Sequence, residues 1–151
     1  MIQTEPQPKK KRRNMHPEHK LQSELVKEFS KKYPERRGEL FATFQETKSQ
    51  GQGGVMLSLG LVSGVSDLLL INNGELTGVE VKFPQSKHNT QHIIRQAQWL
   101  LKVPKIGYFC DSIEIFFEIV KGGKGIDPRK VLNYCNSCGK NTITWDSKLF
   151  F

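Results

Sequence analysis

The feature that most constrains the fold is a predicted β-hairpin in residues 63–83, SGVSDLLLINNGELTGVEVKF. Two apolar runs, 66–72 and 76–83, have the composition of strands. The Asn-Asn-Gly between them suits a tight turn, because Asn and Gly tolerate a positive φ. The sequence therefore predicts two neighbouring antiparallel strands joined by this turn.

Charged residues lie inside both predicted strands: Asp67 in the first, and Glu80 and Lys82 in the second. Side chains alternate between the faces of a strand, so Glu80 and Lys82 share a face, and the hairpin can bring Asp67 alongside Glu80. An isolated charge is costly to bury, whereas a hard cation such as Mg²⁺ relieves the repulsion of two adjacent carboxylates. Such a cation could polarise a phosphate, and Lys82 could orient the attacking water. The alternative is a surface hairpin whose exposed face carries an ordinary Glu and Lys, as edge strands commonly do.

Further elements follow from hydrophobic periodicity and from turn residues. Leu21, Leu25 and Phe29 recur every four residues and predict one apolar stripe on a helix. Helices are predicted at residues 17–33, 55–62, 89–103 and 112–122. Strands are predicted at residues 40–44 and 105–110 and, from a weaker signal, at 142–145. QGQGG at 50–54 indicates a glycine loop.

The formal net charge of +8 favours a polyanionic partner, with nucleic acid the leading choice over a merely basic soluble protein. Five consecutive basic residues lie in PKKKRRN, residues 8–14, and such a block indicates a disordered arm that could contact phosphates in any DNA sequence. The same block resembles a nuclear localisation signal. The residues expected to contact DNA are Lys9, Lys10, Lys11, Arg12, Arg13, Lys87 and Arg95, with solvated surface charges as the alternative for the last two. The four histidines, His16, His19, His88 and His92, are interpreted as surface residues or phosphate contacts.

The three cysteines argue against a secreted disulfide framework and favour a reduced intracellular setting. That setting would be the cytoplasm of a prokaryotic host for a phage or bacterial chain, or the nucleus for a eukaryotic one. No apolar run approaches the length of a membrane span and the basic start lacks a signal peptide's apolar segment, so no membrane partner is expected.

Cys135 and Cys138, in CNSC, have the spacing of half a zinc knuckle. A structural Zn²⁺ needs four ligands, so distant residues or a second subunit would have to complete the site. The alternative is two unpaired thiols or a loose redox pair.

The ordered motifs resemble the VRR-NUC (virus-type replication-repair nuclease) branch of the PD-(D/E)XK nuclease superfamily. Asp67 followed by Glu80-Val81-Lys82 matches the superfamily signature. GLVSGVSDLLL resembles the G-V-x-D-L-x-L strand of the branch, GVEVKFP its E-x-K strand, IIRQAQWLL its helix with Q-x-x-W-L, and YPERRGELFAT its lead-in. The resemblance covers roughly residues 20–120. Ser66 stands where the family usually has Pro, and FQETKSQGQGG replaces a pattern usually rich in Asn and Gly.

The resemblance implies an α/β fold: a restriction-endonuclease-like core with a central mixed sheet flanked by helices. It also implies hydrolysis of phosphodiester bonds that depends on Mg²⁺ or Mn²⁺. The implied metal ligands are Asp67, Glu80 and the backbone carbonyl of Val81, and the implied catalytic residues are Glu24, Asp67, Glu80, Lys82 and Gln96. For Gln96 the alternative is a plain polar position, and for Glu24 it is a solvated helix glutamate.

These observations divide the chain into a disordered basic arm (1–15), a VRR-NUC nuclease domain (16–122) and a C-terminal extension with the cysteine pair (123–151). The predicted function is that of a metal-dependent DNA endonuclease. Small relatives resemble Holliday-junction resolvases that act as symmetric dimers, so branched DNA is the expected substrate and a homodimer the expected assembly. The alternatives are a nicking or flap nuclease without junction preference and, from another class, a non-catalytic DNA-binding protein with a zinc-linked tail.

Overall fold

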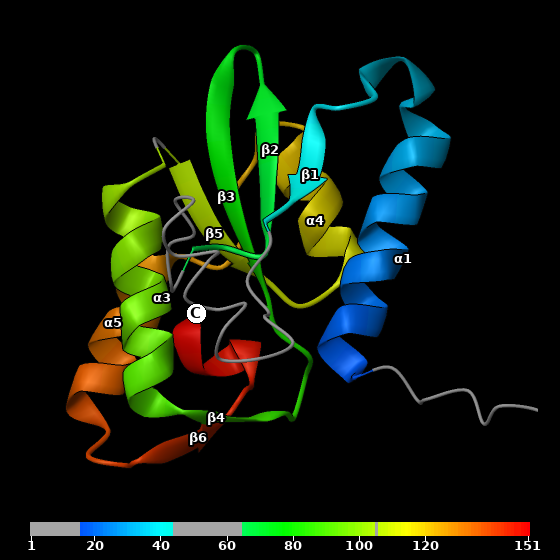
Figure 1. The fold of residues 1–151 in the computed structure, drawn as a ribbon. Coiled ribbons are helices and arrows are strands. Elements are labelled where there is room, and N and C mark those ends of the chain that lie inside the picture. The colour runs from blue at the N-terminus through cyan, green and yellow to red at the C-terminus, as the bar shows by residue number, and fades with distance from the viewer. Residues whose placement is uncertain (1–15, 44–64, 105) are drawn as a thin grey trace, which may run out of the picture.

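The computed structural model of the chain describes residues 16–43, 65–104 and 106–151. The predicted basic arm, the glycine loop at 50–54 and the predicted helix at 55–62 lie outside the described residues. The described parts contain both helices and strands, and helices lie on both faces of a central sheet (Figure 1).

Within the described residues, four strands form this sheet in the order β1-β2-β3-β5 (Figure 1). Their bounds are Leu40–Ala42 for β1, Leu68–Asn72 for β2, Glu75–Val81 for β3 and Ile106–Cys110 for β5. β1, β2 and β3 pair antiparallel, whereas β3 and β5 pair parallel. The predicted α/β class with a mixed central sheet is therefore confirmed.

The hairpin between β2 and β3 turns at Asn73 and Gly74, whose φ angles are 49° and 75°. Two consecutive residues with positive φ are what a tight two-residue hairpin turn requires, and Asn and Gly adopt this conformation at the lowest cost. Asn72 pairs with Glu75 directly beside the turn, so the turn sets the register of both strands. The predicted hairpin is confirmed.

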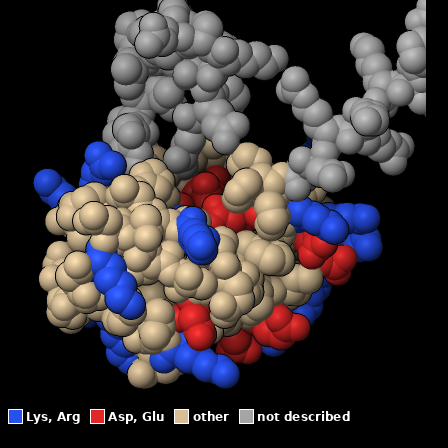
Figure 2. Space-filling model, turned by 90° about the horizontal axis from the view of Figure 1, so that it is seen from below, with Lys and Arg blue, Asp and Glu red and all other residues tan. Residues whose placement is uncertain are grey.

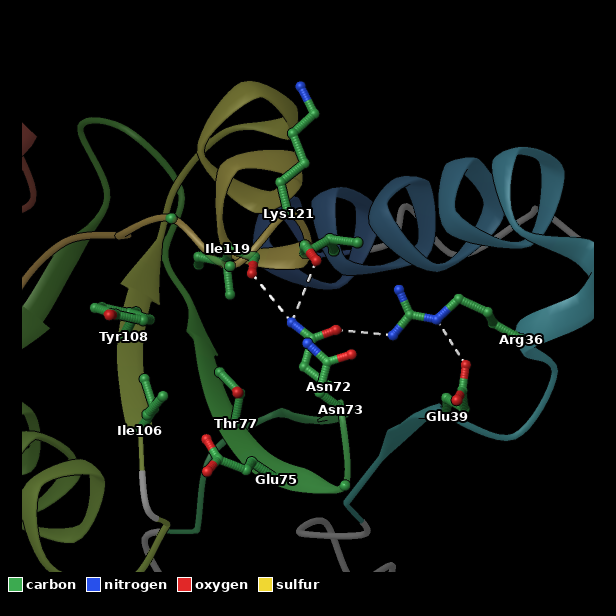
Figure 3. A pocket seen from close by; sticks show the side chains of 14 residues that line it. Arg36, Glu39, Asn72, Asn73, Glu75, Thr77, Ile106, Tyr108, Ile119 and Lys121 are labelled. Carbon is green, nitrogen blue, oxygen red and sulfur yellow. Dashed lines mark hydrogen bonds and ion pairs between the residues drawn. The ribbon is translucent and has the colours of Figure 1, made fainter.

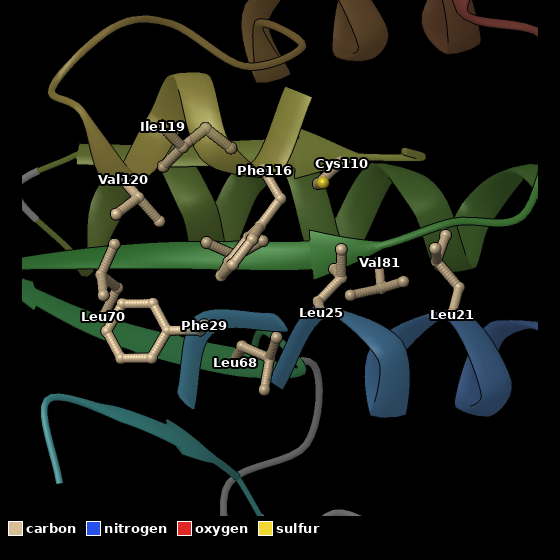
Figure 4. Close-up of a cluster of buried hydrophobic side chains, with 11 residues drawn as sticks. Leu21, Leu25, Phe29, Leu68, Leu70, Val81, Cys110, Phe116, Ile119 and Val120 are labelled. Atoms are coloured by element: carbon tan, nitrogen blue, oxygen red, sulfur yellow. The ribbon is translucent and has the colours of Figure 1, made fainter. Parts of the chain in front are cut away.

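Helices α1 (Pro17–Lys32) and α4 (Ile113–Val120) cover one face of the sheet (Figures 1 and 4). The predicted stripe of Leu21, Leu25 and Phe29 is the buried side of α1. The core beneath it also contains Leu68, Leu70, Val79, Val81, Cys110, Phe116, Ile119 and Val120. The spacing of the apolar residues thus identified the inward side of α1 correctly.

Helices α3 (Thr90–Lys102) and α5 (Pro128–Ser137) lie on the opposite face of the sheet (Figure 1). α3 crosses β5 so closely that a Cβ added at Gly107 would lie 2.7 Å from the backbone oxygen of Leu100. α5 was not predicted from the sequence. Its start is nevertheless encoded locally, since the side chain of Asp127 accepts a hydrogen bond from the backbone N–H of Arg129, with Pro at the first helical position.

The C-terminal part of the chain packs into the core formed by α3 and β5. β6 (Thr142–Thr144) pairs antiparallel with β4 (Lys87–Asn89), which leads into α3. Trp145 follows β6 and is fully buried, with its ring centroid 5.2 Å from that of Phe109. Short 3-10 helices occur at Pro34–Arg36 (η1) and Ser147–Phe150 (η2). The segment 123–151, expected as an extension, is therefore continuous in packing with the rest of the described chain.

Candidate active site

Asp67, Glu80, Lys82 and Gln96 line one cavity of about 510 Å³. Asp67 immediately precedes β2, Glu80 is on β3, Lys82 immediately follows β3, and Gln96 is on α3. The cavity therefore lies at the end of the hairpin that is opposite to its turn. Its other lining residues are Glu18, His19, Gln22, Thr43, His88 and His92. The structure thus brings together four residues that the sequence assigned to one site.

The two carboxylates are fixed by hydrogen bonds that cross the hairpin. The backbone N–H of Asp67 donates to Oε2 of Glu80 at 3.2 Å, and the backbone N–H of Val81 donates to Oδ2 of Asp67 at 2.9 Å. Each strand thus holds the side chain of the other. The hairpin register therefore determines not only that the carboxylates are neighbours but also how they are oriented.

Lys82 follows Glu80 by two residues at the end of β3, whereas Gln96 approaches Glu80 from α3. Nζ of Lys82 lies 3.3 Å from Oε1 of Glu80, and both side chains are only 2% exposed. Nε2 of Gln96 donates to the same Oε1 at 2.5 Å. Glu80 therefore accepts hydrogen bonds on both of its oxygens, as a buried carboxylate must to offset its loss of hydration.

Burial raises the pKa of Glu80 well above its usual value, the charge of Asp67 raises it further, and the nearby Lys82 ammonium only partly opposes them. Burial also raises the pKa of Asp67, against the hydrogen bond from the Val81 backbone and the charge of Lys82. The two groups together hold a proton more readily than separate carboxylates would. A divalent cation would supply the positive charge that this proton supplies, so the donor set fits a hard cation such as Mg²⁺ or Mn²⁺.

Oxygen atoms of Asp67 and Glu80, with the backbone carbonyl of Val81, are the groups that could hold such a cation. No third Asp, Glu, His or Cys joins the two carboxylates in a metal-binding cluster within the part of the chain that the structure describes. This is compatible with Mg²⁺, which commonly uses one or two carboxylates and takes its other ligands from water and substrate phosphates.

Glu24, which the resemblance placed in the site, is solvent-exposed on α1 and does not line the cavity. Glu18 lies there instead, with Oε1 2.9 Å from Nε2 of His88. Burial raises the pKa of Glu18, but the hydrogen bond with His88 and the charges of Lys82, His88 and His16 together outweigh it, so that the pKa is lowered overall. The helical period could have indicated this, because Glu18 precedes Leu25 by seven residues and so continues the buried stripe.

Three of the four histidines, His19, His88 and His92, also line the cavity. From the sequence they were interpreted as surface residues or phosphate contacts, and nothing in the sequence reasoning placed them together. Nε2 of His92 lies 3.1 Å from Nε2 of Gln96, one helical turn away on α3. The spacing of His92 and Gln96 was the available signal, since residues four apart on a helix are neighbours.

Lys87 and Arg95 are exposed, on β4 and α3 respectively, and neither lines the cavity. Figure 2 shows the molecule from the end that carries β4 and β6, where basic side chains are dispersed and separated by other residues. The five basic residues of the arm, Lys9, Lys10, Lys11, Arg12 and Arg13, lie outside the described residues.

Cys135 and Cys138 both belong to the end of α5, where Cys138 is the C-cap. Cys135 is buried in the apolar core beside α3, and this burial raises the pKa of its thiol to about 11. A zinc ligand must be a thiolate, and a high thiol pKa disfavours that form. No group of three or more His, Cys, Asp or Glu placed to hold a metal includes these thiols, as far as the described ranges extend.

A second cavity, of about 590 Å³, lies at the turn end of the hairpin, far along β3 from Glu80 (Figure 3). Here the Arg36 guanidinium donates to Oε2 of Glu39, to the backbone oxygen of Ile71 and to Oδ1 of Asn72. Nδ2 of Asn72 donates in turn to the backbone oxygens of residues 119 and 120, at the end of α4. These polar groups bind one another and connect the hairpin to α4, so we assign them a structural role.

No helix in the described ranges is both long and apolar enough to cross a membrane. Comparisons of the chain with family models, with curated proteins and with solved structures found no match.

Proposed function

We propose that this chain is a metal-dependent DNA endonuclease of the VRR-NUC type within the PD-(D/E)XK superfamily. One observation carries the proposal: Asp67, Glu80, Lys82 and Gln96 converge in one cavity at the end of a mixed sheet. Buried carboxylates with raised pKa values are costly to keep and are concentrated at functional sites. These are four of the five residues that the resemblance implies for catalysis; the fifth, Glu24, does not line the cavity.

In this proposal Asp67 and Glu80 hold Mg²⁺ or Mn²⁺ together with the Val81 carbonyl. A bound divalent cation would polarise the phosphate and lower the pKa of a water molecule. Nζ of Lys82 lies beside Glu80, where it can orient the attacking water and stabilise the negative charge that develops on the phosphate. Gln96 holds the carboxylate of Glu80 through its amide N–H.

DNA is the substrate that the net charge of +8 favours, since a protein that neutralises phosphates with Lys and Arg releases condensed counterions. We further propose that the substrate is branched DNA and that the active form is a homodimer, which would place two sites on two strands. Both parts rest on the resemblance.

The test is cleavage of supercoiled plasmid, followed by a panel of single-stranded, duplex, flap and four-way DNA, in Mg²⁺, in Mn²⁺ and in EDTA. Asp67→Asn should abolish cleavage while DNA binding persists. Glu24→Gln is the matched control, because it neutralises an exposed carboxylate outside the cavity. DNA binding without cleavage in either metal would favour the non-catalytic DNA-binding alternative, and full activity of Asp67→Asn would remove the nuclease proposal.

A further inference from the structure

The side-chain amide of Gln96 is held in an arrangement that leaves one of its atoms without a partner. The residue is 5% exposed, and its Nε2 donates to Oε1 of Glu80. The same Nε2 lies 3.1 Å from Nε2 of His92. Its carbonyl oxygen, Oε1, is buried and has no hydrogen-bond partner among the residues that the structure describes.

The orientation of this amide follows from the groups around it. Reversing it would place the carbonyl oxygen against Oε1 of Glu80, which already accepts a hydrogen bond from Nζ of Lys82, so that two acceptors would be in contact. The NH₂ group must therefore face Glu80, and its second hydrogen then points to His92. A neutral imidazole can accept that hydrogen if the tautomer carries its own proton on Nδ1, which leaves Nε2 free as the acceptor.

We propose that His92 is a positioning residue of the candidate active site: its Nε2 accepts the second amide hydrogen of Gln96, so that Gln96 holds the Glu80 carboxylate in a fixed orientation. The connection runs from His92 to Gln96 to Glu80, each contact being within hydrogen-bond distance. Partners of this kind, which orient a metal-binding carboxylate without touching the metal, set the activity of many metal sites. The catalytic consequence rests on the proposed nuclease function, whereas the hydrogen bond itself does not.

The surroundings of His92 favour the neutral form that this role needs. Partial burial lowers the pKa of His92, and the charges of Lys82, Arg95 and His88 lower it further, while Glu18 opposes them. These influences favour the neutral imidazole. As the pH falls through the pKa, Nε2 gains a proton, the acceptor is lost, and Gln96 is released from one of its two partners.

Two substitutions of His92 distinguish the effect of its hydrogen-bond acceptor from the effect of its side-chain size. His92→Gln places an amide oxygen near the position of Nε2 and keeps an acceptor that does not titrate, whereas His92→Leu removes the acceptor. His92 lines the cavity but is exposed, so both variants should fold, which circular dichroism would check. Gln98→Leu is the control, since Gln98 is an exposed residue of the same helix that does not line the cavity.

The first measurement needs no cleavage. In ¹H–¹⁵N spectra of the full-length, metal-free protein, the side-chain amide signals of Gln96 should shift with the same pH midpoint as the imidazole of His92. This pH-dependent shift of the Gln96 signals should be absent from His92→Gln and His92→Leu and should remain in Gln98→Leu. Gln96 signals that do not follow the titration of His92 would overturn the inference.

The second measurement is the single-turnover cleavage rate in Mg²⁺ between pH 6 and pH 8, with DNA affinity measured alongside. His92→Leu should lower the rate about 10- to 100-fold, the usual range for partners that orient a metal ligand, with unchanged DNA affinity. His92→Gln should restore most of the rate and should lose less activity than the wild type as the pH falls. A wild-type rate in His92→Leu would overturn the inference while leaving the nuclease proposal intact. A wild-type chain that cleaves no DNA would instead remove the nuclease proposal, and the amide signals would still decide whether His92 holds Gln96.

Discussion

The clearest physical test of the site is the pH dependence of folding stability when Glu80 is replaced by Gln. The pKa of Glu80 in the folded chain is raised well above the ordinary value of 4.5, first by burial and then by Asp67. The ordinary value of 4.5 applies to Glu80 in the unfolded chain. At a pH between 4.5 and the raised pKa of the folded chain, the unfolded chain has lost the proton that the folded chain keeps, so the stability of the fold falls as the pH rises. One such group costs about 1.4 kcal/mol per pH unit, which for a chain of this size lowers the melting temperature by about 3–6 °C per unit.

Glu80→Gln removes this pH-dependent loss of folding stability and adds a loss of stability that does not depend on pH. Gln has one acceptor oxygen where Glu has two, so one of the donors from Asp67, Lys82 or Gln96 loses its partner, at a cost of about 1–3 kcal/mol. The variant should therefore be less stable than the wild type near pH 5. The two stabilities should become equal roughly one to two pH units above 4.5, and beyond that point the metal-free variant should be the more stable.

Metal binding should make the wild type more stable than Glu80→Gln again at the higher pH. Mg²⁺ at about 100 times its Kd would stabilise the wild type by about 2.7 kcal/mol, and Glu80→Gln should gain much less. The assay is thermal and urea unfolding from pH 5 to pH 8.5, with and without Mg²⁺, with Glu24→Gln as the control for removal of an exposed carboxylate. A Glu80→Gln variant with the wild-type pH slope, or one that Mg²⁺ stabilises as strongly as the wild type, would refute the reasoning.

Three further predictions concern other parts of the chain. Lys82→Ala should leave Mg²⁺ affinity largely unchanged, because Lys is not a ligand, but should lower the single-turnover rate by about 100-fold or more; an unchanged rate would exclude a catalytic role. Deleting residues 1–14 should weaken DNA binding and make its salt dependence shallower by about one log–log unit per lost phosphate contact, with cleavage chemistry intact; an identical salt slope would show that the arm does not touch DNA. If Cys135 and Cys138 hold zinc, mass spectrometry of the purified protein should find it, and Cys138→Ser should lose both the metal and stability; zinc-free protein that tolerates the substitution would contradict the zinc hypothesis.

Most of the fold was predictable because its signals are local. The positive φ angles at Asn73 and Gly74 need residues that tolerate them, and the apolar spacing of α1 and α3 marks their buried sides. α5 was missed although Asp127 and Pro128 encode its start, because the cysteine pair directed the interpretation of that segment towards a metal site.

The pairing of Asp67 with Glu80 was also accessible from the sequence. Thirteen residues separate them, and a tight turn of known type fixes which residues face each other across a hairpin. Gln96 came from the resemblance, and the helical spacing that joins it to His92 was visible but was not used.

What only the tertiary structure decided is which helix ends reach the cavity. Glu18 and Glu24 both belong to α1, and the resemblance pointed to Glu24, yet Glu18 is the residue that lies against His88 in the cavity. His88 itself is placed by the pairing of β4 with β6, a strand more than fifty residues further along the chain. Local sequence sets the period of a helix and the register of a hairpin, whereas the meeting of distant elements depends on how the whole core packs, which no short segment encodes.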